Sequence, residues 1–298
     1  MQQPRFTIQP SFNSATDEYA ARDLQRIQRY RKWTLRLGVV LLLALVCFTR
    51  AGFDRSSADG FRDYFRQLTE FEPTRAGWSG IQHYTWLCIN AKEAENVELS
   101  REVIAMIPEF LDRPGVLGIG EIGLNKNTPN ECTIFREHVD LAMKTNEQIL
   151  IHTPHLDDKY KGTRMIIDML LEDDRVDPGR VLIDHVEEHT VGLAREEGFW
   201  CAMTLYPVTK CTPSRAADII EMYGTDRIMV NSAGDWGPSN PTAVPDFIME
   251  LRRRGQNESK IKKIVYDNPI EFFSGSERFE FTPPDVFREN APTGVDAG

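Results

Sequence analysis

From residue 80 onward, short apolar runs alternate with longer stretches in which apolar residues recur at helical spacing. The apolar runs are continuous and are flanked by glycine, proline or charged residues, which is typical of parallel strands covered on both faces. The pattern predicts strands at residues 83–89, 116–122, 148–151, 181–183, 199–205 and 228–231. Between them it predicts helices at 97–111, 133–144, 163–171, 190–196, 214–223 and 244–253. Strands alternating with helices predict an α/β fold with a parallel sheet.

A further apolar run, residues 38–48, lies near the N-terminus behind the basic stretch 29–32. Its eleven residues are short for a bilayer-spanning helix, which needs ~20. Thr49 and Arg50 follow it, where a signal peptide would carry small residues. We therefore favour a buried strand. A basic-flanked membrane anchor through residues 38–48 is the alternative, because Leu35 and Leu37 lengthen the apolar stretch.

The first 37 residues predict a short strand at 6–12, with Pro10 at its end or edge, and an amphipathic helix that begins near Thr16. The two N-terminal strands raise the predicted total to eight, the number in a (β/α)8 TIM barrel. We therefore expect a TIM barrel with an irregular first βα unit. The expected domains are a divergent strand and helix over 1–37, the barrel over 38–281 and a loose tail over 282–298.

Composition narrows the class of protein. The 298 residues carry a formal net charge of -10, so a surface that attracts nucleic acid through dense lysine and arginine is not supported. The 5 cysteines are scattered without a CxxC pair, which does not suit a disulfide framework and favours a reducing, cytoplasmic location.

Polar side chains stand where several predicted strands end. Glu121, His152 and His185 each close or follow an apolar run, and Asp235 follows the last one. Because the carboxyl ends of barrel strands converge on one mouth, we expect these four groups to meet there. Imidazole and carboxylate ligands suit zinc, manganese or iron. The alternative is a set of hydrogen bonds and salt bridges that closes the barrel mouth.

Three neighbours of these groups are candidates for substrate contact or for support of a metal ligand. His155 lies three residues beyond His152 and is equally well explained as a surface histidine. Tyr206 and Trp236 lie near strand ends, where aromatic side chains line pockets or fill the barrel mouth. His83 and His138 are interpreted as structural.

In these motifs the sequence resembles the TatD-like metal-dependent hydrolases, a branch of the amidohydrolase-type TIM barrels. The resemblance runs from about residue 80 to 273 and rests on five motifs, at 120–123, 151–155, 183–185, 232–237 and 268–273. It implies that Glu121, His152 and His185 hold one divalent metal ion, such as zinc, manganese or magnesium. It also implies that Asp235 contacts a second metal and the attacking water. The expected activity is hydrolysis of a small-molecule ester, amide or phosphoester.

The sequence departs from this family at its first strand, where the family carries a His-x-His pair. Ser11 and Asn13 occupy the equivalent positions here, and their oxygens bind transition metals more weakly than imidazole does. This favours a single-metal site of three ligands with an open position. The alternative hypothesis is a catalytically impaired pseudoenzyme that serves as a binding or assembly module.

Overall fold

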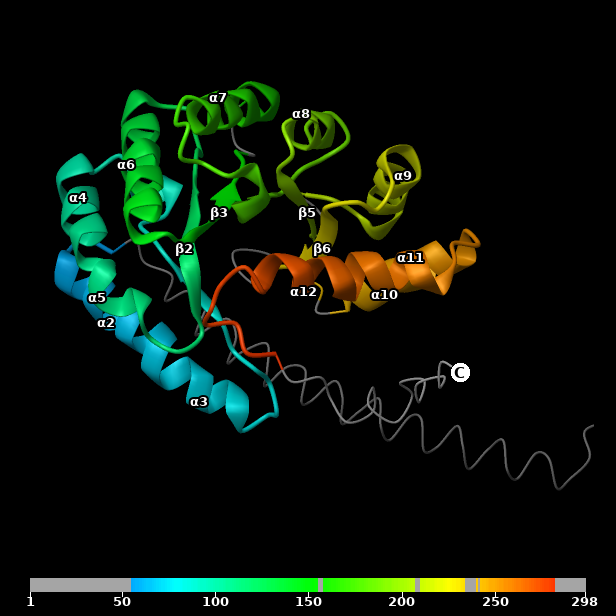
Figure 1. The fold of residues 1–298 in the computed structure, drawn as a ribbon, viewed down its shortest axis with the longest axis horizontal. Helices are drawn as coiled ribbons and strands as arrows, with labels where there is room; N and C mark the ends of the chain where they lie inside the picture. The colour runs from blue at the N-terminus through cyan, green and yellow to red at the C-terminus, as the bar shows by residue number, and fades with distance from the viewer. Residues whose placement is uncertain (1–54, 155–157, 207–209, 234–239, 241, 282–298) are drawn as a thin grey trace, which may run out of the picture. The chain divides into compact units, whose positions relative to one another are not determined.

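Six parallel strands form one sheet whose spatial order follows the chain (Figure 1). The structure is a computed structural model that describes residues 55–154, 158–206, 210–233, 240 and 242–281. The strands are β1 Thr85–Leu87, β2 Val116–Gly123, β3 Gln148–His152, β4 Val181–Asp184, β5 Trp200–Leu205 and β6 Ile228–Ser232. Each overlaps a predicted strand, and the predicted α/β fold is confirmed. The strand at 83–89 was predicted too long, since only its central residues pair with β2.

Helices follow the strands and lie outside the sheet (Figure 1). The connecting helices are α4 Val97–Met106, α5 Pro108–Leu111, α6 Pro129–Thr145, α7 Lys159–Leu171, α8 Val191–Glu196, α9 Pro213–Tyr223 and α10 Ala243–Arg253. The chain continues through α11 Glu258–Lys262, a π-helix η4 Lys263–Asp267 and α12 Asn268–Phe273. Two 3-10 turns complete this part, η2 Ala91–Glu93 and η3 Pro178–Arg180.

The predicted helix at residues 97–111 is two helices, because Pro108 lacks the backbone N–H that would continue the first one. Other helices begin earlier than their apolar periodicity predicts. Thr128 caps α6, with proline at the first helical position, and Asp158 caps α7. A threonine cap followed by proline stabilises a helix start without adding to its apolar face, so periodicity alone misses it.

A helical segment before β1 was not predicted. It consists of α2 Ala58–Arg66, the π-helix η1 Gln67–Phe71 and α3 Glu72–Gly77. Ser57 caps α2, and Phe61 and Phe65, one turn apart, bury their rings against the main core. The spacing of four residues between Phe61 and Phe65, which places both rings on the same face, is the sequence pattern that indicates this helix.

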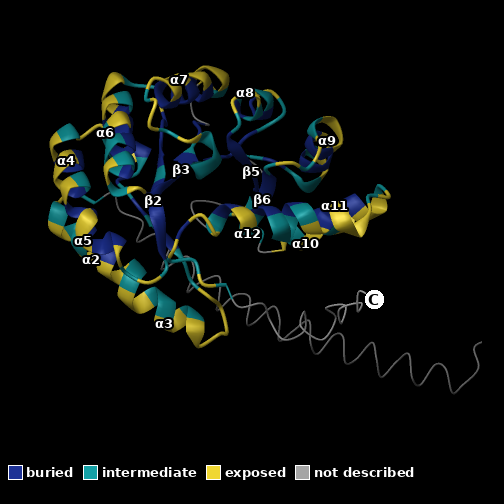
Figure 2. Cartoon of the chain, in the orientation of Figure 1, coloured by how far each residue is buried: buried dark blue, intermediate teal, exposed yellow. Residues whose placement is uncertain are grey.

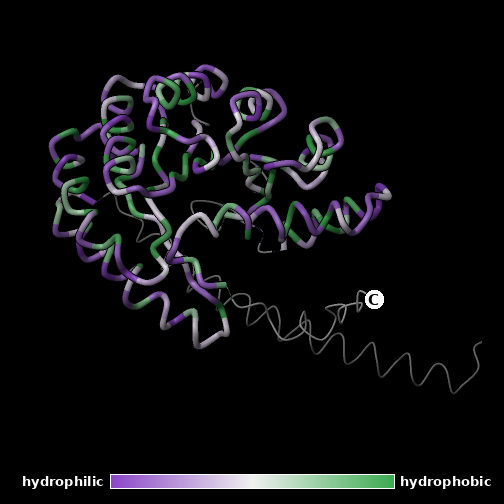
Figure 3. The backbone as a smooth tube through the Cα atoms, viewed as in Figure 1, coloured by the Kyte–Doolittle hydropathy of each residue, from purple (hydrophilic) through white to green (hydrophobic). Residues whose placement is uncertain are grey.

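The core lies between the sheet and the helices, and the strands are its most buried elements (Figure 2). Hydrophobic and hydrophilic positions alternate along the helices, so each helix presents one face to the sheet (Figure 3). Ile119 of β2, Ile149 of β3 and Val181 of β4 are in register across the sheet and fully buried.

The predictions for the first 54 residues lie outside the described residues, and so do those for the C-terminal tail. The strands at 6–12 and 38–48, the eight-strand count and the domain boundaries therefore stay predictions. Within the described part of the chain, no helix is both long enough and apolar enough to cross a membrane.

Candidate metal centre

Three predicted ligands come from neighbouring strands at the same end of the sheet. Glu121 lies near the end of β2, His152 is the last residue of β3, and His185 directly follows β4. In the register of the sheet, Gly123 pairs with His152, and His152 pairs with Asp184. The parallel strands therefore deliver a carboxylate and two imidazoles to one edge, as the sequence predicts.

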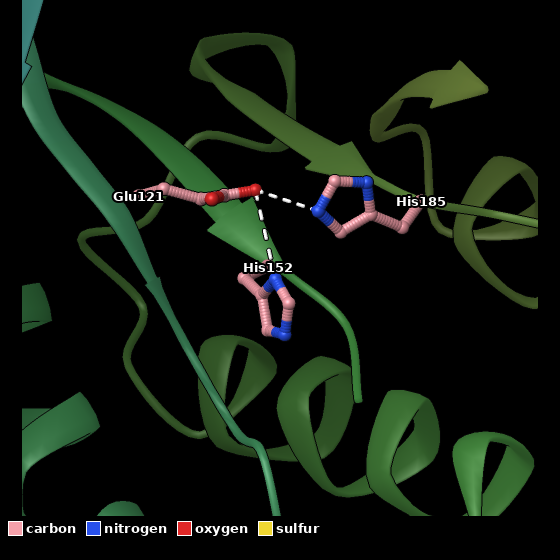
Figure 4. A group of neighbouring side chains, drawn as sticks. All are labelled: Glu121, His152 and His185. Carbon is pink, nitrogen blue, oxygen red and sulfur yellow. Dashed lines mark ion pairs between the residues drawn. The ribbon is translucent and has the colours of Figure 1, made fainter. Parts of the chain in front are cut away.

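The three side chains point toward one another (Figure 4). Glu121 Oε1 lies 2.9 Å from His185 Nε2 and 3.7 Å from His152 Nδ1. One ligand atom from each residue falls within 4.8 Å of the other two. The two imidazole rings are nearly perpendicular, with centroids 4.9 Å apart. Two nitrogen ligands and one oxygen ligand fit a divalent transition-metal ion and leave a position for water or substrate.

His185 is oriented by a chain of hydrogen bonds that reaches β5 and β6. Its Nδ1 lies 2.6 Å from Thr204 Oγ1, and Thr204 donates its hydroxyl hydrogen to Asp184 Oδ1 at 2.9 Å. Because that hydrogen is already donated, the Thr204 oxygen accepts from Nδ1–H. Asn231 Nδ2 holds the other Asp184 oxygen at 3.0 Å. Nε2 is therefore the nitrogen of His185 that is left for a metal ion, and it lies on the side of the ring that faces Glu121.

The backbone of His185 adopts an uncommon conformation. Its φ is 62°, in the left-handed region that non-glycine residues seldom adopt. Its backbone N–H donates to Asp184 Oδ1 at 2.6 Å, and Thr153 donates its hydroxyl to the Asp184 carbonyl at 2.9 Å. These contacts hold a conformation that costs free energy, which is typical of functional sites.

Burial and mutual contact set the charges of the ligands. Burial opposes ionisation of Glu121, but the contacts with His152 and His185 outweigh it and hold the pKa of Glu121 well below its usual value. Burial lowers the pKa of His152 below 6.5, partly offset by the Glu121 carboxylate. An ionised carboxylate beside a neutral imidazole is the protonation state that binds a cation.

Lys210 lies on the loop after β5 and brings a positive charge to the centre. Its Nζ is 3.2 Å from His185 Nε2 and 5.8 Å from the centroid of the Tyr206 ring. Tyr206 is buried directly after β5. Its predicted role in substrate contact stays a prediction, although the structure places the ring beside a cation at the metal centre.

Ion pairs at the same end of the sheet join helices α7 and α9 to the segment that follows β4. Lys159 Nζ lies 3.3 Å from Glu187 Oε1. Arg215 makes two hydrogen bonds to the Glu188 carboxylate, at 2.6 and 2.7 Å. These contacts connect α7 and α9 to the segment that follows His185.

Several predicted site residues lie outside the described residues: Asp235, Trp236, His155, Ser11 and Asn13. Sequence analysis missed Thr204, Asp184 and Asn231 as partners of His185. Hydroxyl and amide side chains near the end of a strand carry no local signal for this role, whereas an Asp directly before a predicted His ligand is a usable one. The structural interpretation of His138 is supported, since its ring is buried between α6 and the segment after β1.

The fold and this site define a class: α/β proteins with a candidate divalent-metal centre at the carboxyl ends of parallel strands. The chain belongs to the family described as TatD related DNase, whose model matches residues 79–274. The resemblance that the motifs suggest is thereby confirmed.

Individual relatives agree with this assignment. An uncharacterized metal-dependent hydrolase of Methanocaldococcus jannaschii is 29% identical over 223 residues, which cover 74% of this chain and 86% of that protein. A TatD-like protein from Archaeoglobus fulgidus has a similar structure, with a TM-score of 0.57, 23% identity, and coverage of 77% of this chain and 93% of the other. The phosphotriesterase homology protein from Escherichia coli, solved with phosphate in its active site, aligns with a TM-score of 0.53 and 16% identity over 68% of this chain and 79% of the other.

Proposed function

We propose that this protein is a metal-dependent hydrolase that cleaves a small ester, amide or phosphoester with water. Glu121, His152 and His185 would hold one divalent cation, and its identity among zinc, manganese and magnesium stays open. A cytoplasmic location is part of the proposal, supported by the free thiols of the four cysteines within the described residues.

When bound, such a cation lowers the pKa of water toward ~7 and polarises the bond to be cleaved. The residues of the chain have separate tasks. Thr204 and Asp184 keep the Nε2 lone pair of His185 available, and Glu121 supplies the negative charge of the ligand set. By family resemblance, Asp235 would orient the attacking water and take its proton.

The observation that carries the proposal is the convergence of one carboxylate and two imidazoles from three adjacent strands within 4.8 Å. A purely structural cluster would satisfy these groups with neutral or oppositely charged partners. Here the atoms able to ligate a metal face one another, and contact with the two imidazoles lowers the pKa of the Glu121 carboxyl. Membership of the TatD related DNase family supports the same function.

The test is metal analysis of the purified full-length protein, together with Glu121→Ala, His152→Ala and His185→Ala variants. We expect one bound metal ion per wild-type chain after reconstitution. Each variant should lose more affinity than the roughly 10- to 100-fold that removal of an outer hydrogen-bond partner costs. His83→Ala is the matched control, because His83 precedes β1 at the opposite end of the sheet. Substoichiometric metal in the wild type, with the variants behaving identically, would contradict the proposal.

The second candidate function is a catalytically impaired binding or assembly module. The presence of Ser11 and Asn13 in place of the family's first-strand histidines favours it. Hydrolysis that depends on added zinc or manganese, and that is lost in His152→Ala but not in His83→Ala, would exclude this candidate.

A further inference from the structure

The backbone of Lys210 is held in place beside the metal centre. Cys211 pairs with Leu205, the last residue of β5, and its N–H donates to Thr204 O at 3.2 Å. The carbonyl of Lys210 accepts a hydrogen bond from Arg215 Nη1 at 2.8 Å. Arg215 is itself fixed by the paired hydrogen bonds to Glu188. The position of Lys210 is therefore defined by β5 on one side and by α9 on the other.

The ammonium group of Lys210 has no acidic partner in the described part of the chain. No carboxylate there lies within the 4.0 Å that defines an ion pair. Its contacts are the Nε2 atom of His185 and the Tyr206 ring. Lys159, the first residue of α7, provides the comparison, since its ammonium is paired with Glu187 at 3.3 Å. A lysine that only stabilised the loops would be paired in the same way.

The positive charges at the candidate metal centre favour the binding of an anion. Glu121 is the only carboxylate among the three clustered ligands, and Asp184 already accepts hydrogen bonds from Thr204 and Asn231. A divalent cation on Glu121, His152 and His185 would stand beside the Lys210 ammonium and repel it. An anionic group that contacts both positive charges removes this repulsion and makes a charge-assisted hydrogen bond to the lysine.

We propose that Lys210 is a specificity-determining residue that binds an anionic group of the substrate next to the metal centre. This inference rests on the proposed hydrolase function. The group is an oxyanion, either a phosphate or a carboxylate close to the bond that is cleaved. Lys210 approaches the centre from the loop after β5, so it contacts substrate from a side that the three ligands do not occupy.

The direct test measures binding of inorganic phosphate by isothermal titration calorimetry to the metal-loaded full-length protein. Lys210→Gln should weaken phosphate binding by about tenfold or more, because it removes a charge-assisted contact. Lys210→Arg should retain most of the affinity. Lys144→Gln is the control, since Lys144 is an exposed lysine near the end of α6. Unchanged phosphate affinity in Lys210→Gln would overturn the inference.

A kinetic test separates the two kinds of oxyanion. It compares three p-nitrophenyl esters, a phosphate, an ester with a free carboxylate and the neutral acetate, in wild type and Lys210→Gln. We expect KM to rise about tenfold for whichever anionic ester the wild type prefers, and by clearly less for the acetate. Equal changes for the anionic and neutral esters would overturn the role of Lys210.

The outcomes for the two proposals are distinguishable. Metal-dependent hydrolysis whose selectivity does not change in Lys210→Gln contradicts only the role of Lys210. Failure of the three ligand variants to alter metal content contradicts the hydrolase proposal, and with it the inference that depends on it.

Discussion

Thr204 Oγ1 lies 2.6 Å from His185 Nδ1, although Thr204 belongs to β5, His185 follows β4, and the two are separated by 19 positions. The Thr204 hydroxyl donates a hydrogen bond to Asp184, so its oxygen accepts a hydrogen bond from the Nδ1–H of His185. One buried threonine thus selects which nitrogen of His185 is left with a lone pair. Metal-binding histidines usually carry an outer partner of this kind.

Thr204→Val keeps the shape of this side chain and removes the hydroxyl. Without the acceptor, His185 loses the hydrogen bond that selects its tautomer, and we expect the affinity for zinc or manganese to fall about 10- to 100-fold. Thr204→Ser retains the hydroxyl and is the control. Calorimetric titration with metal measures both variants, and equal affinities for the Val and Ser proteins would contradict the role of the hydroxyl.

Gly123→Ala tests the close approach of β2 to β3. A Cβ atom at Gly123 would lie 1.9 Å from the carbonyl oxygen of His152, so the strands would have to separate at the metal centre. We expect a loss of about 1–3 kcal/mol in unfolding free energy and a weaker metal site. Gly77→Ala is the control, since a Cβ there meets nothing within 4 Å. Denaturant unfolding measures the free energy of unfolding of both variants. Equal values would show that β2 and β3 can separate without loss of stability.

Glu131→Gln tests the loop that follows β2. The buried Glu131 carboxylate accepts backbone hydrogen bonds from Asn125 and Lys126 at 2.9–3.0 Å and completes the capping box with Thr128. The neutral amide offers one acceptor oxygen fewer, so we expect a loss of about 2 kcal/mol in unfolding free energy. Glu137→Gln, which removes an exposed ion pair to Arg101, should change stability by less than about 1 kcal/mol. The prediction fails if the two variants unfold at the same denaturant concentration.

His138 predicts how stability depends on pH. Ile89 N–H donates to its Nε2 at 3.2 Å, so the ring is neutral and its Nδ1–H donates to Ile134 O at 2.8 Å. Burial lowers its pKa from 6.5 to about 4. The unfolded chain therefore takes up a proton at higher pH than the folded chain does, and stability conferred by the neutral ring falls as the pH drops from 6.5 toward 4.

The expected loss from this one group is up to about 3 kcal/mol across that pH range. Urea unfolding of the wild type at several pH values measures it. His138→Gln is less stable at neutral pH but should show a shallower decline below pH 6.5, because the titrating ring is gone. A variant whose decline matches that of the wild type would show that other groups account for the acid sensitivity.

Much of the fold could be predicted because buried strands leave a clear local pattern. Val181 to Asp184 form a continuous apolar run that ends in a polar residue, and a run of this kind identifies both a strand and the end at which chemistry is expected. The helix before β1 was missed because its burial depends on two phenylalanines in a largely polar stretch. The early starts of α6 and α7 were missed because caps lie outside the apolar face.

By itself, the sequence was enough to identify the α/β class, the positions of six strands and the family, since strand patterns and motifs are local properties of the chain. It also placed Glu121, His152 and His185 at strand ends, where parallel strands must converge. Only the tertiary structure decided which partners act on them. The hydrogen bond between Thr204 and His185, and the ammonium of Lys210 that meets no carboxylate among the described residues, depend on the direction in which side chains from separate strands and loops point. No local pattern encodes that direction.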